Sequence, residues 1–198
     1  MESKENPFLL KIPRSSTLQI RELPDFDHRV LLCRELYDEV LSVFETKGVR
    51  PMSSSYRAKT DESIRKYLDI RSRLRGYRSE RPIFDIYGIR VIIRGEEEIA
   101  NAIQTILDHF NPPAKYFGSI DSVVDYRNPR IRPFPFSDER YKAVHIRIPF
   151  GNNGVKNLGE IQLMTPEWYE MNKKTEIDYQ QNKDSLVPSR GIEPPSKP

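Results

Sequence analysis

The run Phe84–Ile93 constrains the fold more than any other feature, because it combines the pattern of a core strand with two charges. Eight of its ten residues are apolar, aromatic or glycine, which is typical of a strand buried on both faces. Asp85 and Arg90 interrupt this run. Burying an unpaired charge costs several kcal/mol. Asp85 therefore requires a partner, either Arg90 in a structural ion pair or a hard cation such as Mg²⁺, which binds carboxylate oxygens.

Composition limits the class of protein. The 198 residues are 37% hydrophobic, enough for one domain with a core. The net charge of +3 does not indicate a general nucleic-acid coat, but residues 50–94 hold twelve Lys and Arg against five Asp and Glu. This excess suits a polyphosphate, nucleotide or RNA partner, or a solvated helix face. The single Cys33, and a sequence without a signal-peptide pattern or long apolar run, lead us to expect a cytoplasmic protein without membrane contact.

The spacing of apolar residues predicts a mixed α/β (α+β) domain. Helical spacing predicts helices over 27–47, 60–75, 96–110 and 166–181, with Thr60 as an N-cap. Strands are predicted over 84–93, 141–149 and 158–164, with a hairpin turn at 152–154 and a loop-rich stretch over 112–140. We expect a single domain over 26–182, preceded by a polar arm (1–25) and followed by a disordered tail (183–198).

Residues suited to phosphate chemistry lie on the predicted core strands and at one predicted helix start. Asp85 and Glu160 are carboxylates on different strands, and such a pair can hold Mg²⁺ against a triphosphate or divide metal binding and general-base work. Basic and hydroxyl side chains surround the start of the helix 60–75, where backbone N–H groups favour anions: Arg57, Lys59, Ser63 and Lys66. The alternative is a basic helix face in solvent.

Five short motifs follow one another over residues 57–165. They are Arg57-Ala-Lys59-Thr-Asp-Glu-Ser63-Ile64, Asp85-Ile-Tyr-Gly88-Ile89-Arg90, Asp125-Tyr126, Tyr141-Lys-Ala-Val-His145 and Glu160-Ile-Gln162-Leu-Met-Thr165. In content and order the set resembles the motifs of the RelA/SpoT alarmone synthetases. Each motif alone is weak, whereas the ordered set spans more than half of the chain. The absence of further recognisable domains makes the chain similar to the small stand-alone synthetases.

The resemblance implies a nucleotidyltransferase-like mixed sheet flanked by helices. It also implies an ATP-dependent pyrophosphokinase of the GTP/GDP diphosphokinase type, which uses Mg²⁺ and makes the (p)ppGpp alarmones of the stringent response. By the same resemblance, Asp85 would ligate Mg²⁺, and Glu160 would assist the metal or activate the acceptor hydroxyl. The implied ATP contacts are Arg57, Lys59, Ser63, Lys66 and Arg90. The implied acceptor contacts are Tyr141, which stacks on the base, His145 and Gln162.

Departures from the family pattern fall mainly on the acceptor side. Where the family has lysine, glycine, serine and arginine, this chain has Val124, Arg140, Ala143 and Met164. Lys66 follows Ser63 by three residues rather than four, and the loop over 129–141 is longer than usual and rich in arginine. Two alternatives therefore stay open: a toxin that pyrophosphorylates the 3′ end of tRNA, with an antitoxin as partner, and an inactive nucleotide- or RNA-binding relative. Assembly into homo-oligomers through terminal helices is a further expectation.

Overall fold

Helices form where the sequence places apolar residues at helical spacing. A computed structural model describes residues 23–73, 83–116, 120–128, 140–151 and 157–182. Its four helices begin at or next to the predicted residues: α2 (Phe26–Thr46), α3 (Asp61–Arg73), α4 (Glu96–Phe110) and α5 (Pro166–Asn182). Thr60 is an N-cap as predicted, because its hydroxyl accepts a hydrogen bond from the backbone N–H of Ser63 at 3.2 Å. No helix among these residues has the length and apolar character needed to cross a membrane.

One mixed sheet forms the centre of the described structure. Its strands are β1 (Ser53–Ala58), β2 (Tyr87–Ile92), β5 (Val123–Asp125), β6 (Val144–Phe150) and β7 (Asn157–Met164), in the order β1-β2-β7-β6-β5. β2 and β7 are parallel, and the other neighbours are antiparallel. The short strands β3 (Lys115–Tyr116) and β4 (Ile120–Asp121) pair separately. The expected single domain with a mixed sheet flanked by helices is confirmed.

Several predicted boundaries were wrong. The predicted strand 84–93 begins only at Tyr87, because Phe84–Ile86 form a 3₁₀ turn. Strand β1 was not predicted, since most of its side chains are exposed and show no apolar alternation. The stretch 112–140, predicted as loop, contains β3, β4 and β5, and the strand predicted from 141 begins at Val144. The tail and the turn at 152–154 lie outside the described residues, as does most of the arm.

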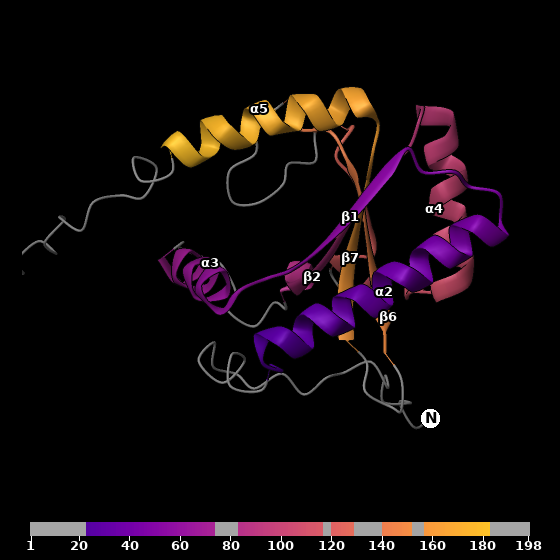
Figure 1. The fold of residues 1–198 in the computed structure, drawn as a ribbon. Coiled ribbons are helices and arrows are strands. Elements are labelled where there is room, and N and C mark those ends of the chain that lie inside the picture. The colour runs from indigo at the N-terminus through magenta and orange to yellow at the C-terminus, as the bar shows by residue number, and fades with distance from the viewer. Residues whose placement is uncertain (1–22, 74–82, 117–119, 129–139, 152–156, 183–198) are drawn as a thin grey trace, which may run out of the picture.

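The core lies on one face of the sheet. Ile89, Ile161 and Ile146 occupy one cross-strand row, and each is at most 1% exposed. They pack with apolar side chains of α2 and α4 in the main hydrophobic cluster. Figure 1 shows α2 and α4 on this side of the sheet and α3 and α5 toward the other side. Cys33 and Trp168 are buried in the same cluster.

Candidate active site

The other face of the sheet carries polar residues in two cross-strand rows, which we call the polar face. The strand register places the first row in the order Arg57, Gly88, Glu160, Arg147. The second row is Ser55, Arg90, Gln162, His145. Successive rows are two residues apart on each strand, so their side chains point to the same side. Strand pairing thus brings four of the five sequence motifs together.

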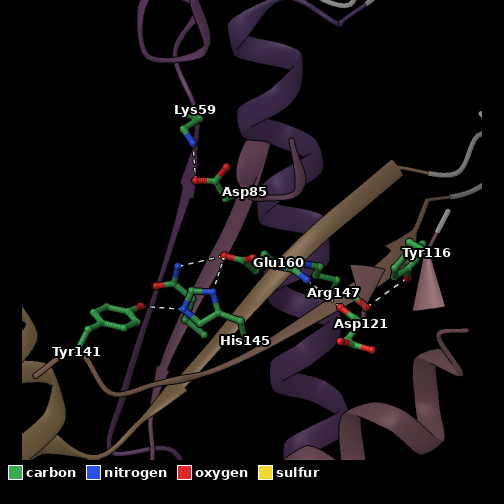
Figure 2. A network of polar contacts seen from close by, with 9 residues as sticks. Lys59, Asp85, Tyr116, Asp121, Tyr141, His145, Arg147 and Glu160 are labelled. Atoms are coloured by element: carbon green, nitrogen blue, oxygen red, sulfur yellow. Dashed lines mark hydrogen bonds and ion pairs between the residues drawn. The ribbon is translucent and has the colours of Figure 1, made fainter. Parts of the chain in front are cut away.

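Asp85 and Lys59 form an ion pair beside the first row. The Lys59 ammonium donates a hydrogen bond to the Asp85 carboxylate (Figure 2) and lies 4.9 Å from the ring centroid of Tyr67. The Lys59 side chain is 12% exposed and that of Asp85 is 34% exposed. Asp85 therefore keeps solvent access, while the ammonium beside it supplies the positive charge that phosphate oxygens require. Asp85 therefore pairs with Lys59, and not with Arg90, which was the structural ion-pair partner considered from the sequence.

The remaining predicted ATP contacts lie on β1, α3 and β2. Arg57 is exposed near the end of β1, and Ser63 is exposed in the first turn of α3. Lys66 is exposed one turn further along α3. Arg90 is half-buried on β2, with its guanidinium carbon 5.5 Å from the ring centroid of Tyr169. Of these groups, Arg57, Ser63 and Lys66 lie in the segment around the N-terminus of α3, an arrangement that favours phosphate.

The donor set around Asp85 fits Mg²⁺ in the form that accompanies a nucleotide. Among the described residues, no group of three or more His, Cys, Asp and Glu side chains is arranged to hold a metal ion. Mg²⁺ at nucleotide sites usually takes only one or two carboxylates and completes its shell with phosphate oxygens and water. The half-exposed Asp85 carboxylate meets this requirement, whereas an all-protein metal cage does not exist in this region.

Glu160 is buried in contact with three polar side chains (Figure 2). Its Oε1 lies 3.0 Å from His145 Nδ1 and 3.4 Å from Gln162 Nε2, and its Oε2 lies 3.6 Å from Arg147 Nε. Burial alone would raise the pKa of Glu160, but the His145 imidazole and the Arg147 guanidinium outweigh burial and hold that pKa below its ordinary value. Glu160 is therefore an ionised carboxylate with both oxygens in contact with the chain.

Tyr141 connects to Glu160 through His145. The Tyr141 hydroxyl lies 2.7 Å from His145 Nε2, the ring nitrogen opposite the one that faces Glu160. The ring of Tyr126 meets His145 edge-on with centroids 4.7 Å apart, and meets Tyr141 with centroids 5.6 Å apart. Burial raises the pKa of the Tyr126 hydroxyl. Tyr141 is thus an aromatic side chain fixed at the edge of a polar network, as a stacking platform for a base requires.

The acid of the Asp125-Tyr126 motif has a structural partner. Asp125 accepts hydrogen bonds from Arg127 Nε at 2.8 Å and from Arg127 Nη2 at 2.6 Å. These bonds hold the pKa of Asp125 below its usual range. The Arg127 guanidinium in turn lies 6.0 Å from the ring centroid of Trp168. Asp125 therefore anchors the turn after β5, which places Tyr126 beside His145.

Sequence reasoning did not identify Arg147 or Tyr67 as parts of the site, and it gave no role to Tyr126, although the motif Asp125-Tyr126 contains it. Arg147 follows His145 by two residues on an alternating strand, so the alternation that placed His145 also places Arg147 on the polar face. Tyr67 carried no comparable pattern, because its contact with Lys59 depends on how α3 packs. Asp85 and Glu160 were predicted as a pair of carboxylates on different strands. The structure puts them on neighbouring segments, and each has its own basic partner.

Both the sequence and the fold of this chain are similar to those of known proteins. A family model described as "Region found in RelA / SpoT proteins" matches residues 56–184. The fold is similar to a GTP pyrophosphokinase family protein from Streptococcus pneumoniae, with a TM-score of 0.56, 18% identity, and coverage of 80% of this chain and 74% of that one. It is also similar to small alarmone synthetase 2 from Bacillus subtilis, with a TM-score of 0.53, 19% identity, and coverage of 84% and 86%. A search of curated proteins finds no match. The matched region covers more than half of the sequence and contains all ten predicted site residues, and the chain belongs to the RelA/SpoT family.

Proposed function

We propose that this protein is an ATP-dependent pyrophosphokinase that transfers the β,γ-diphosphate of ATP to the 3′-hydroxyl of GDP or GTP. The acceptor oxygen forms a bond to the β-phosphorus of ATP, and the bond from that phosphorus to the α,β-bridging oxygen breaks. AMP leaves, and the hydroxyl proton passes to a base or to water. Such a transfer depends mainly on positioning and on neutralising phosphate charge. The products are a guanosine 3′-diphosphate alarmone and AMP.

The observation that carries this proposal is the polar face, which brings the donor and acceptor motifs of the family onto one side of the sheet. On the donor side, Lys59 and Arg57 bind the phosphates and the adenine of ATP, respectively. Asp85 would hold the Mg²⁺ that accompanies ATP, since it is a partly exposed carboxylate beside a fixed ammonium. Further phosphate contacts come from Ser63, Lys66 and Arg90. When bound, Mg²⁺ neutralises the charge that develops on the transferred group.

On the acceptor side, Tyr141 stacks on the acceptor base, while His145 and Gln162 contact its sugar and phosphates. Glu160 lies between Gln162 and His145. Because both carboxylate oxygens already contact polar groups of the chain, we assign Glu160 to the acceptor hydroxyl and Asp85 to the metal. This division separates the two acids by environment, as is common where two carboxylates have different roles.

A second candidate acceptor is the 3′ end of tRNA. Ala143 and Met164 stand where the family has a serine and an arginine, and they are 0% and 1% exposed. Val124 stands where the family has a lysine, and it is half-buried beside His145 in the β5–β6 register. Three polar or charged positions of the family are therefore apolar and wholly or partly buried here. At the 3′ end of tRNA the acceptor ribose carries a single phosphodiester in place of a diphosphate or triphosphate, so apolar residues at these three positions are compatible with this acceptor.

The test is a transfer assay with ATP labelled on the γ-phosphate and Mg²⁺, in parallel reactions with GDP, GTP and deacylated tRNA. Label on a guanosine nucleotide supports the first acceptor, and label on tRNA supports the second. Binding of a non-hydrolysable ATP analogue without transfer to any acceptor would instead identify an inactive relative. If the protein transfers label to no acceptor, the proposed function is wrong, whether or not the analogue binds.

A further inference from the structure

Arg147 faces Glu160 directly across the strands β6 and β7. The two residues are register partners, with Arg147 Nε 3.6 Å from Glu160 Oε2. Their side chains are 14% and 8% exposed, respectively. The opposite neighbour of Glu160 in the row is Gly88, which has no side chain to hold the carboxylate. Within the first row, Arg147 is therefore the side chain that fixes Glu160 laterally.

Arg147 is itself held from several directions, as Figure 2 shows. Its Nη1 donates a hydrogen bond to the backbone carbonyl of Asp121 at 2.8 Å. Its backbone N–H donates to the carbonyl of Ser122 at 2.7 Å, and its own carbonyl accepts from the Tyr116 hydroxyl at 3.3 Å. These contacts tie Arg147 to the segment around β3 and β4, outside the five-stranded sheet. The guanidinium therefore has a defined position before any ligand binds.

A continuous set of contacts leads from Arg147 to the acceptor side of the site. Arg147 contacts Oε2 of Glu160, whose Oε1 lies 3.0 Å from His145 Nδ1. His145 Nε2 lies 2.7 Å from the Tyr141 hydroxyl. Glu160 and His145 thus each contact the preceding residue through one side-chain atom and the following residue through another. Removing Arg147 would take the charged contact from Oε2 of Glu160, which would weaken the constraint on the orientation of this carboxylate and on the contacts that follow it.

We propose that Arg147 is a positioning residue of the acceptor half of the site, which fixes Glu160 and, through Glu160 and His145, the orientation of Tyr141. The proposal rests on the proposed function for the identity of the bound acceptor. In this role Arg147 does not touch the substrate. Arg147 affects acceptor binding and the geometry of the acceptor hydroxyl. The ATP side is held separately, by the ion pair of Lys59 and Asp85.

The experiment compares Arg147→Met and Arg147→Lys with the wild type. Arg94→Met removes the same charge from an exposed position at the end of β2 and is the matched control. Steady-state kinetics gives KM for acceptor and for ATP, and calorimetry gives binding of GDP and of a non-hydrolysable ATP analogue. Proton NMR follows the His145 Nδ1–H signal, which hydrogen bonding to Glu160 protects from exchange. A His145→Gln variant assigns that signal among the three histidines.

For Arg147→Met we expect acceptor KM to rise on the order of 10- to 100-fold, with ATP-analogue binding within about twofold of wild type. The His145 Nδ1–H signal should be lost. In Arg147→Lys, both the rise in acceptor KM and the loss of this signal should be smaller. A thermal melt checks that each variant is folded. If Arg147→Met does not fold, the same KM and NMR measurements on Arg147→Lys test the proposal. Unchanged acceptor KM and an unchanged NMR signal would overturn the proposal.

The NMR result does not depend on the proposed function. If the wild type transfers label to no acceptor, the proposed function fails, yet loss of the His145 signal in Arg147→Met would still establish the positioning role. If the wild type is active and the signal persists in a folded Arg147→Met, the proposed function stands and the inference about Arg147 fails.

Discussion

At the scale of single residues, the two acids of the site differ in what surrounds them. Asp85 pairs with Lys59 and has a side chain that is 34% exposed, whereas the side chain of Glu160 is 8% exposed and has contacts on both oxygens. A ligand can reach the first carboxylate without breaking a buried network. Reaching the second requires that contacts with His145 or Arg147 be exchanged, which is costly in a low-dielectric environment.

The first prediction concerns Asp85→Asn. Replacing the carboxylate by a neutral amide removes the proposed Mg²⁺ ligand, so transfer should fall by about 100-fold or more. Binding of the ATP analogue without Mg²⁺ should change little. Asp38→Asn, on an exposed face of α2, is the matched control. Transfer at the wild-type rate in Asp85→Asn would remove the proposed mechanism.

The second prediction separates the two parts of Tyr141. Tyr141→Phe keeps the ring and loses the 2.7 Å contact with His145, whereas Tyr141→Ala also loses the stacking surface. Stacking on an aromatic side chain contributes about 1–3 kcal/mol per base. Acceptor KM should therefore rise by about tenfold or more in Tyr141→Ala and by less in Tyr141→Phe, as measured by steady-state kinetics. Equal KM values for wild type and Tyr141→Ala would contradict the stacking role.

At the scale of helices and strands, the sequence was most informative where one face is buried continuously. The helix α4 was predicted with its observed bounds because its apolar residues recur at helical spacing and pack on the sheet. The edge strands β1 and β5 were missed for the opposite reason. β1 exposes most of its side chains, and β5 is three residues long. Their strand character comes from pairing with β2 and β6, which is a tertiary effect.

The third prediction concerns the packing of β7 against α2. A Cβ atom at Gly159 would lie 2.6 Å from Leu36 Cδ2 and 3.3 Å from Phe150 Cε1. Leu36 is 0% exposed, so its side chain can shift only against its packed neighbours in the core. Gly159→Ala should lower the free energy of unfolding by about 1–3 kcal/mol, measured by denaturant unfolding.

Gly88→Ala is the matched control for this packing. The nearest atom to its added Cβ is the backbone oxygen of Arg57, at an ordinary 3.6 Å. Its stability should stay close to that of the wild type. If Gly159→Ala were as stable as Gly88→Ala, the close approach of β7 to α2 would be wrong.

At the scale of the whole molecule, the motifs are far apart in sequence and meet through the order of the strands. The set of site residues followed from a resemblance in motif order, and the sheet explains why that order brings them together: β2 and β7 are parallel neighbours, with β6 beside β7. The interaction partners of those residues could not be predicted from the sequence. Sequence pattern cannot show that Lys59 reaches Asp85 or that Arg147 faces Glu160, because both contacts depend on register and on how separate segments pack.

The fourth prediction tests the electrostatics of this assembly through stability. The pKa of Glu160 is lower in the folded protein than its ordinary value of 4.5, so the ionised carboxylate stabilises the fold. This stabilisation is fully present above the pKa that Glu160 has in the unfolded chain. It is lost as the pH falls toward the lower pKa that Glu160 has in the folded protein. Below about pH 4.5, the free energy of unfolding of the wild type should therefore fall more steeply than that of Glu160→Gln, by at most about 1.4 kcal/mol per pH unit.

Denaturant unfolding from about pH 7 to about pH 3 measures both slopes. Glu97→Gln, which removes an exposed carboxylate from the first turn of α4, controls for the loss of one negative charge. The difference between wild type and Glu160→Gln should be constant at neutral pH and shrink only in the acid range, because the unfolded chain takes up the proton first. A difference that stayed constant throughout would show that His145 and Arg147 do not hold Glu160 ionised in the folded protein.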